Sequence, residues 1–184
     1  MANTIIVGDG PGGLSAALFL AKNDHDVQVF GQNETAMNYA QLHNYLGVLD
    51  KSGEDFMVEA RAQVVAQGAA LVSAKVDSVA AVDGRYLVTL EGGERAGCDY
   101  LIMNEGRNPE LTLSLGVEVT AEGAIVVDGQ GLSSVPNVYV IGRSVRPSRS
   151  QAIITAGAGA AAALDILSLE AGKDVQDWDS PPKE

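Results

Sequence analysis

The stretch TIIVGDGPGGLSAALFLAK, residues 4–22, decides the fold of this chain. Its first four residues form an apolar run typical of a buried strand, and its Ala- and Leu-rich half, from residue 13, is typical of a helix. Between the two stands G-x-G-x-x-G at Gly8–Gly13. A strand, this glycine motif and a helix in that order indicate a site that binds a dinucleotide.

Three glycines of the motif have distinct physical roles. Gly8 permits the tight turn out of the strand, Gly10 lets the backbone approach a pyrophosphate without an intervening Cβ, and Gly13 lets the helix pack closely on the strand. The first turn of the helix then offers free N–H groups and a partial positive charge to the phosphates.

The second strand, expected at 27–30, lacks the carboxylate that usually follows it. An acidic side chain at this point accepts hydrogen bonds from the ribose hydroxyls in dinucleotide-binding folds, whereas this chain has Gly31, Gln32 and Asn33. The nearest carboxylate, Glu34, is expected in the following loop. Two interpretations stay open: an occupied dinucleotide site, or a domain that kept the glycines for packing and lost the ligand.

The rest of the chain alternates between helical and strand patterns. Ser52 is a suitable N-cap for a helix at 54–67, and Asp83-Gly84 between two alternating runs predicts a β-hairpin. The buried face of that helix is expected to carry Phe56, Ala60, Val64 and Val65. Further strands are expected at 76–82, 85–90, 99–103, 124–127 and 138–141, and a long helix at 151–169.

We predict an α/β fold: a doubly wound, mostly parallel, Rossmann-like sheet with a three-stranded antiparallel β-meander. Residues 1–172 would form a single domain that binds FAD or NAD(P). Residues 173–184 would form an acidic C-terminal tail, either loose or docked on the domain.

The charge balance restricts the partners. Asp and Glu total 24 against 12 Lys and Arg, a formal net charge of −12. This argues against nucleic acid, which requires a basic face. Salt screens the self-repulsion of an acidic surface. We therefore favour a protein adapted to high salt over an acidic protein of a mesophile. No apolar stretch resembles a membrane span and the start lacks the basic region of a secretory signal, so a cytoplasmic location is expected.

The titratable residues give no sign of a catalytic or metal site. The single cysteine, Cys98, excludes an internal disulfide and a C-x-x-C pair, and is expected to be a half-buried strand residue. His25 in a turn and His43 in a loop lack the spacing of metal ligands or of a nucleophile–base pair. We therefore assign no catalytic or metal-binding residue.

A second group of residues lies near the C-terminus. A strand ending in Gly142 is followed by a polar loop and the small-residue run 151–165, whose first turn again directs N–H groups at a ligand. Close packing alone is the competing explanation for the small residues. Arg143, Arg146 and Arg149 form a basic cluster. Either Arg143 binds a pyrophosphate bidentately, or the three make surface ion pairs of little energetic worth.

Five segments together resemble a known family: Gly8–Gly13, Asn44–Gly47, Leu101–Gly106, Val138–Arg143 and Ser150–Asp165. In order and spacing, over nearly the whole chain, they are similar to the FAD domain of the thioredoxin reductase-like flavoproteins, in the pyridine nucleotide-disulfide oxidoreductase family. That family inserts an NADPH domain with a redox C-x-x-C pair between the two halves. Here Leu101–Gly106 passes directly into Arg107-Asn108-Pro109, so the resemblance implies the FAD domain alone.

The resemblance implies FAD as the cofactor. It would place the pyrophosphate at the N-terminal glycine loop and Asn44 near the flavin. Gly142, Gln151 and Ala152 would contact the ribityl and isoalloxazine end. The implied cofactor-binding residues are Gly8, Gly10, Pro11, Gly12, Gly13, Gln32, Asn44, Gly106, Gly142, Arg143, Gln151 and Ala152. Two departures stand out: Arg143 replaces an aspartate of the family, and Asn104-Glu105 replaces its Ala-Thr.

Two functions are weighed. One is a small FAD-binding oxidoreductase that receives electrons from a redox partner protein, an external reductant or the second subunit of a homodimer. The other is a degenerate, non-catalytic module that binds a nucleotide or a partner. The departures at Gly31 and Arg143 favour the second, whereas the intact glycine motif and C-terminal helix favour the first. An NAD(P) binder is disfavoured, because the N-terminal motif in this architecture usually serves FAD.

Overall fold

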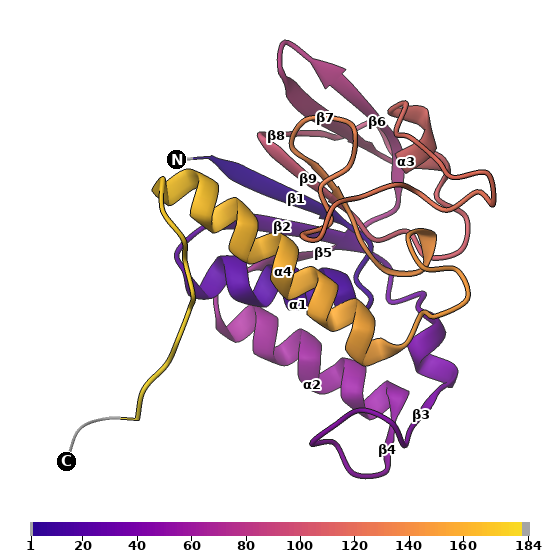
Figure 1. The fold of residues 1–184 in the computed structure, drawn as a ribbon, viewed down its shortest axis with the longest axis vertical. Helices are drawn as coiled ribbons and strands as arrows, with labels where there is room; N and C mark the ends of the chain where they lie inside the picture. The colour runs from indigo at the N-terminus through magenta and orange to yellow at the C-terminus, as the bar shows by residue number, and fades with distance from the viewer. Residues whose placement is uncertain (1, 182–184) are drawn as a thin grey trace.

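A computed structural model describes residues 2–181, and a five-stranded parallel sheet lies at its centre (Figure 1). Its strand order is β10-β9-β1-β2-β5. These strands are β1 (Asn3–Val7), β2 (Asp26–Gly31), β5 (Ala70–Ser73), β9 (Tyr100–Met103) and β10 (Val138–Val140). A separate antiparallel sheet contains β6 (Val76–Val82), β7 (Arg85–Leu90) and β8 (Arg95–Cys98). The predicted fold class, a parallel sheet with a three-stranded meander, is confirmed.

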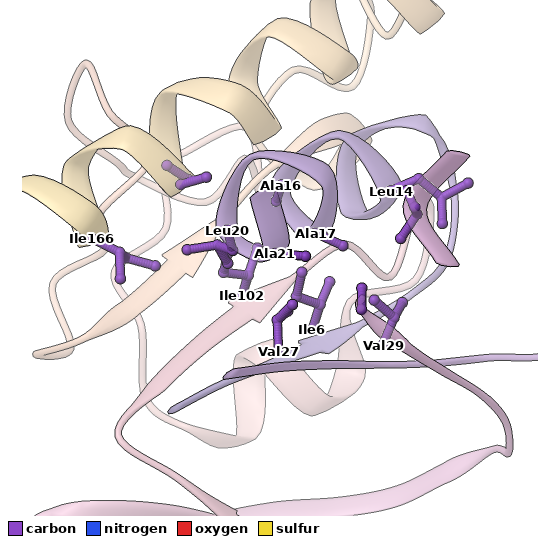
Figure 2. Packing of buried hydrophobic residues seen from close by; sticks show 14 of the residues in the cluster. Ile6, Leu14, Ala16, Ala17, Leu20, Ala21, Val27, Val29, Ile102 and Ile166 are labelled. Atoms are coloured by element: carbon purple, nitrogen blue, oxygen red, sulfur yellow. The ribbon is translucent and has the colours of Figure 1, made fainter. Parts of the chain in front are cut away.

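Side-chain alternation along β1 divides the interior into two cores. Ile6 packs with the helices α1 (Pro11–Lys22), α2 (Gly53–Ala66) and α4 (Ala152–Ala171), which cover one face of the sheet. Its neighbours Ile5 and Val7 point the other way and pack with β6–β8. Figure 2 shows the helix side, where α1 sits on the strands and meets Ile166 of α4. Both faces of β1 are therefore buried, as its continuous apolar run requires.

Glycines bring α1 and α4 into direct backbone contact. A Cβ at Gly159 would lie 2.1 Å from the carbonyl oxygen of Gly12. A Cβ at Gly12 would in turn lie 2.7 Å from Cγ2 of Thr155. The small residues of α4 therefore have a packing role, and this crossing brings the N-terminal ends of both helices to one edge of the sheet.

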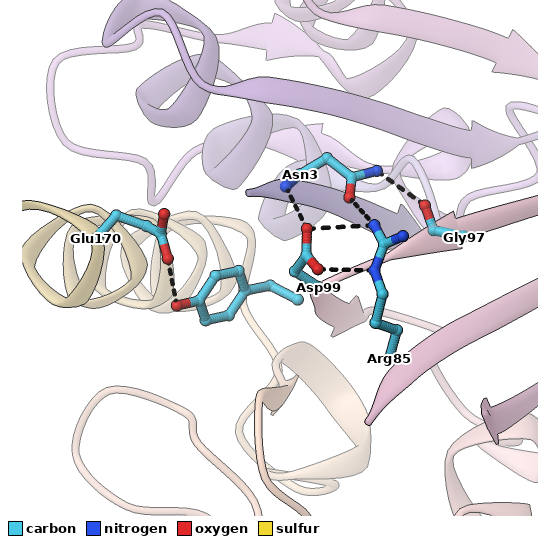
Figure 3. A network of polar contacts seen from close by, with 6 residues as sticks. Asn3, Arg85, Gly97, Asp99 and Glu170 are labelled. Carbon is cyan, nitrogen blue, oxygen red and sulfur yellow. Dashed lines mark hydrogen bonds and ion pairs between the residues drawn. The ribbon is translucent and has the colours of Figure 1, made fainter. Parts of the chain in front are cut away.

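A polar network joins the start of β1 to the meander (Figure 3). The Asn3 N–H donates to Oδ2 of Asp99 at 3.0 Å, and Nε of Arg85 donates to Oδ1 at 2.7 Å. Burial opposes ionisation of Asp99, but the Asn3 N–H and the Arg85 guanidinium outweigh it and lower the pKa of that carboxyl. Nearby, the Tyr100 hydroxyl donates to Oε1 of Glu170 at 2.8 Å, which ties the end of α4 to the sheet.

The remaining elements are short. They are η1 (Ala36–Tyr39), β3 (Gln41–Leu42), β4 (Lys51–Ser52), α3 (Glu110–Ser114) and η2 (Gly142–Ser144). The strand predicted at 124–127 is wrong, because this segment makes single bridges from Ile125 to Val119 and from Val127 to Ser133. Its two ends meet different partners, so neither ladder extends.

Helix α2 forms where predicted, but the prediction of which residues it buries was partly wrong. The Asp55 N–H donates to Oγ of Ser52 at 3.0 Å, which confirms the N-cap. Val64 is buried as expected, whereas Val65 is 54% exposed and Met57, which the sequence pattern did not select, is 1% exposed. Positions 57 and 64 are two helical turns apart, and one residue further around the helix faces solvent.

Helix α4 and the tail that follows it both pack against the rest of the domain. An 18-residue window of helix α4 has a mean hydropathy of 1.8, so by length and composition the helix could cross a membrane. This corrects the expectation that no stretch resembles a span. Its residues Ala162, Ala163 and Ile166 are fully buried in the core, as expected of an internal helix. The described part of the tail is docked: Nζ of Lys22 in α1 lies 3.0 Å from Oδ1 of Asp177.

Substituting two glycines of α4 should have opposite effects on stability. Gly159→Ala should lower the free energy of unfolding by about 1–3 kcal/mol, because the new methyl group overlaps the Gly12 carbonyl. Gly157→Ala should raise it by about 0.5–1 kcal/mol, because that position has open space and alanine favours the helix. Urea denaturation measures both. Equal effects of the two substitutions would contradict the close crossing.

Protonation of His25 should destabilise the fold. Nε2 of this ring lies 2.8 Å from Oγ1 of the buried Thr4, and burial lowers the pKa of the imidazole below its usual 6.5. The unfolded chain then binds more protons than the folded chain below about pH 6.5, so stability falls as the pH drops through this window. Compared with wild type, His25→Gln should lose less stability between pH 7 and pH 5.5. The exposed His43→Gln serves as the control, and an identical loss in all three proteins would contradict the expectation.

Candidate functional site

A cleft of about 740 Å³ opens where β1, β2 and β9 end. This size is typical of a pocket for a cofactor, and the carboxyl ends of parallel strands are where such folds bind ligands. Of the predicted site residues, those that line it are Gly8, Gly10, Pro11, Gln32, Asn44, Gly106, Arg143, Gln151 and Ala152. Gly12, Gly13 and Gly142 do not line it, and a Cβ at any of the three would come within 2.7 Å or less of a neighbouring atom. The structure thus gathers the two sequence halves of the predicted site at one cleft.

The glycines of the motif differ in what requires them. A Cβ at Gly13 would lie 2.0 Å from the carbonyl oxygen of Gly8, which is the close helix–strand contact expected of that position. Gly8 has a φ of +104°, and a Cβ there would lie 2.3 Å from the carbonyl oxygen of Asn104. At Gly10 the nearest atoms to a Cβ are Nδ2 of Asn104 at 3.3 Å and Oγ1 of Thr35 at 3.5 Å. Packing therefore explains Gly8 and Gly13, whereas the space in front of Gly10 belongs to the cleft.

Two helix N-termini face this cleft without side-chain caps in the described part of the chain. Helix α1 begins after Gly10 and helix α4 after Gln151, and neither has an acidic residue in its first turn. By contrast, α2 is capped by Ser52 and has two acidic residues, Glu54 and Asp55, in its first turn. The free N–H groups and positive ends of α1 and α4 are thus available to an anion at the cleft.

The residues expected at the flavin end contact one another. Nδ2 of Asn44, in the turn between β3 and β4, donates to Oε1 of Gln151 at 3.1 Å. This bond joins the N-terminal half of the site to the start of α4, although 107 residues separate the partners. Their binding roles stay predictions.

Arg143 keeps its charge available. It lines the cleft and is half-buried, and among residues 2–181 no carboxylate lies within 4.0 Å of the guanidinium groups of Arg143, Arg146 or Arg149. The surface ion-pair interpretation of this cluster is therefore wrong for the described residues. Arg146 and Arg149 are exposed and lie outside this cleft.

Asn104 and Glu105, which stand where the resemblance implies Ala-Thr, line the cleft and are hydrogen-bonded within the protein. Nδ2 of Asn104 lies 3.4 Å from the carbonyl oxygen of Gly8, so its amide bridges the ends of β9 and β1. The Glu105 carboxylate accepts the N–H groups of Leu111 at 3.0 Å and Thr112 at 2.8 Å, which caps α3. This carboxylate is therefore already engaged by the protein.

Asp9, inside the glycine motif, was not selected from the sequence. Its side chain is 6% exposed, accepts the Asn33 N–H at 2.9 Å and forms an ion pair with Arg61 of α2. The signal was present, because an acidic residue at an inner position of the motif places a carboxylate beside the predicted phosphate site. Its partners come from the loop that follows β2 and from α2, which local patterns do not bring together.

The cysteine offers no reactive thiolate. Cys98 at the end of β8 is fully buried, and burial raises the pKa of its thiol to about 12. No group of three or more His, Cys, Asp or Glu side chains with metal-binding geometry occurs in residues 2–181. The half-buried position expected for Cys98 is thus corrected to a fully buried one.

A sequence profile describing the pyridine nucleotide-disulphide oxidoreductase family matches residues 48–160. The chain belongs to this family. Trypanothione reductase from Trypanosoma congolense is 42% identical over 64 residues, which cover 33% of this chain and 13% of that protein. The chain therefore matches a small part of this curated relative.

Solved structures of thioredoxin reductases share the fold. The enzyme from Gloeobacter violaceus superposes with a TM-score of 0.86 at 17% identity, covering 98% of this chain and 99% of that chain. The enzyme from T. acidophilum gives a TM-score of 0.81 at 14% identity, covering 92% and 99%. The likeness extends over nearly all of the chain and confirms the resemblance to this fold.

Substitution of Gly10 should separate packing from ligand binding. Gly10→Val should leave the melting temperature within a few degrees of wild type, because only adaptable side chains approach the new atoms. The bulky group should nevertheless abolish nucleotide binding by filling the space in front of the motif. Gly8→Val is the matched control and should lose stability, since its Cβ overlaps backbone. Calorimetry with ADP, together with thermal melts, measures both, and full binding by Gly10→Val would contradict the predicted diphosphate position.

Proposed function

We propose that this protein is an FAD-binding oxidoreductase in which one domain carries the whole cofactor site. The proposal rests on the cleft at the ends of β1 and β9, where, among residues 2–181, two helices without side-chain caps and an arginine without an ion pair converge. An extended cofactor with a central diphosphate suits this arrangement of N–H donors and positive charge. Membership of the pyridine nucleotide-disulphide oxidoreductase family supports FAD over other dinucleotides.

The chain's own residues would bind and orient the cofactor. The first turn of α1 and the guanidinium of Arg143 would hold the diphosphate, and the empty space at Gly10 would admit it. Asn44 and Gln151, already bonded to each other, would position the flavin end. Bound FAD supplies the redox chemistry, and the protein contributes geometry and electrostatics.

We propose that reducing electrons arrive from outside the domain. The sequence holds one cysteine, whose thiol is buried, so it provides no C-x-x-C pair. Strand β9 leads within a few residues into α3, at the place where the family inserts its NADPH domain. A partner protein, an external reductant or the second subunit of a homodimer would then reduce the flavin. We also propose a cytoplasmic location, and the acidic composition supports surroundings of high salt.

The competing function is a non-catalytic module that kept the fold. Gly31 favours it, because the usual ribose carboxylate is missing from the end of β2. Such a module would bind a partner or a nucleotide without redox chemistry, and its cleft would not retain flavin.

FAD binding decides between these functions. Protein purified in high salt should be yellow or should take up added FAD stoichiometrically, and should release flavin on denaturation. Reduction with dithionite should bleach the visible absorption band of the bound flavin, as expected of a redox-competent flavin. Colourless protein that binds no added FAD would contradict the proposal and favour the non-catalytic module.

Removing the charge of Arg143 should weaken FAD binding. Arg143→Gln should raise the dissociation constant by roughly tenfold to a hundredfold, the usual worth of a charge-assisted hydrogen bond in a cleft. Arg149→Gln is the matched control, because this exposed arginine does not line the cleft. Equilibrium dialysis of FAD against the three proteins measures the effect. Equal affinities would show that Arg143 makes no contact with the cofactor.

A further inference from the structure

The space beside Gly31 is filled by another side chain. A Cβ at Gly31 would lie 2.3 Å from Cγ and 2.5 Å from Oδ1 of Asp9. The carboxylate of Asp9 therefore stands at the end of β2, directly where a side chain at position 31 would begin. It reaches this place from the turn between β1 and α1.

The protein holds this carboxylate through one of its two oxygens. Oδ2 accepts the Asn33 N–H at 2.9 Å and pairs with the guanidinium of Arg61. In the described part of the chain, no donor is within hydrogen-bonding distance of Oδ1. Asp9 also lines the cleft. One oxygen thus fixes the orientation of the group, and the other stays free to accept a bond from a ligand.

We propose that Asp9 accepts the hydroxyl groups of the cofactor's adenosine ribose, in place of an acidic residue at position 31. This inference rests on the proposed function and assigns the ribose contact within it. The acceptor that seemed lost from the end of β2 is supplied from the glycine loop, at nearly the same point in space. Gly31 is then required, because any side chain there would collide with Asp9.

Arg61 offsets the negative charge that Asp9 brings close to the expected diphosphate. A carboxylate inside the glycine motif adds negative charge close to the first turn of α1, where the phosphates are expected. The guanidinium of Arg61 pairs with that charge, and Arg143, which also lines the cleft, has no carboxylate within 4.0 Å among residues 2–181. The same carboxylate disfavours a ribose that carries a phosphate, so the site should prefer an unmodified diol.

A purely structural role is the competing explanation. The ion pair between Asp9 and Arg61 joins the glycine loop to α2, and it could serve as a clamp alone. A clamp predicts that variants change stability without changing the preference for ribose hydroxyl groups. The ribose contact predicts a change in that preference.

The test compares ADP with 2′,3′-dideoxy-ADP by calorimetry, next to a direct titration with FAD. Wild type should bind ADP at least about tenfold more tightly than the dideoxy nucleotide, and Asp9→Asn should reduce this ratio below about threefold. The double variant Asp9→Asn with Arg61→Met leaves no unpaired guanidinium at the half-buried position 61 and should show the same loss of preference. Arg61→Met alone should keep the preference if it folds, because the ribose acceptor remains.

A rescue experiment moves the carboxylate from position 9 back to position 31. Gly31→Glu alone should lose FAD affinity, because its side chain collides with Asp9. Combined with Asp9→Gly, it should recover FAD affinity to within about tenfold of wild type, since the carboxylate returns to the end of β2. A double variant that binds no better than Asp9→Gly alone would count against the exchange.

The outcomes separate the two proposals. If wild type binds FAD but shows no preference for ADP over its dideoxy form, or if Asp9→Asn keeps the preference, the role of Asp9 is overturned and FAD binding stands. If wild type binds neither FAD nor ADP, both proposals are overturned together.

Discussion

The backbone contact between α1 and α4 is the constraint on which the rest of the structure depends. Gly159 lies against the carbonyl of Gly12, and Gly13 lies against that of Gly8, so two successive glycines of one motif touch a helix and a strand. Any side chain at these points would push the layers apart. Because both helices are held so closely, their N-termini converge near the ends of β1 and β9, where the cleft lies.

The small residues of the C-terminal helix have a packing role on which the proposed site depends. Gly159 and Ala162 allow the crossing, and the crossing places Gln151 at the cleft. The bond between Gln151 and Asn44 then closes the site from the side of the β3–β4 turn. Packing and ligand geometry are therefore parts of one physical solution, and the packing explanation of these residues does not compete with the functional one.

The sequence predicted those parts of the fold whose signals are local. The β1–α1–β2 unit, the Ser52 cap and the Asp83-Gly84 hairpin depend on neighbouring residues, and the structure has all of them. The segment 124–127 failed because its pairing depends on two distant partners that each offer one residue. Val65 was misplaced because a helix with a weak apolar stripe leaves its buried face to tertiary contacts, which select Met57 and Val64.

The candidate site shows the same limit at the level of single residues. From the sequence alone, Gly31 indicates a lost ribose contact, because a sequence motif relates each role to one position in the chain. In space, a side chain at position 31 and the side chain of Asp9 would occupy the same volume, because the chain returns after 22 residues to contact the glycine loop. The two positions exclude each other sterically, so an acidic residue at either one requires a small residue at the other. The proposed ribose acceptor is thus defined by its position in space at the end of β2, which Asp9 reaches from the turn between β1 and α1.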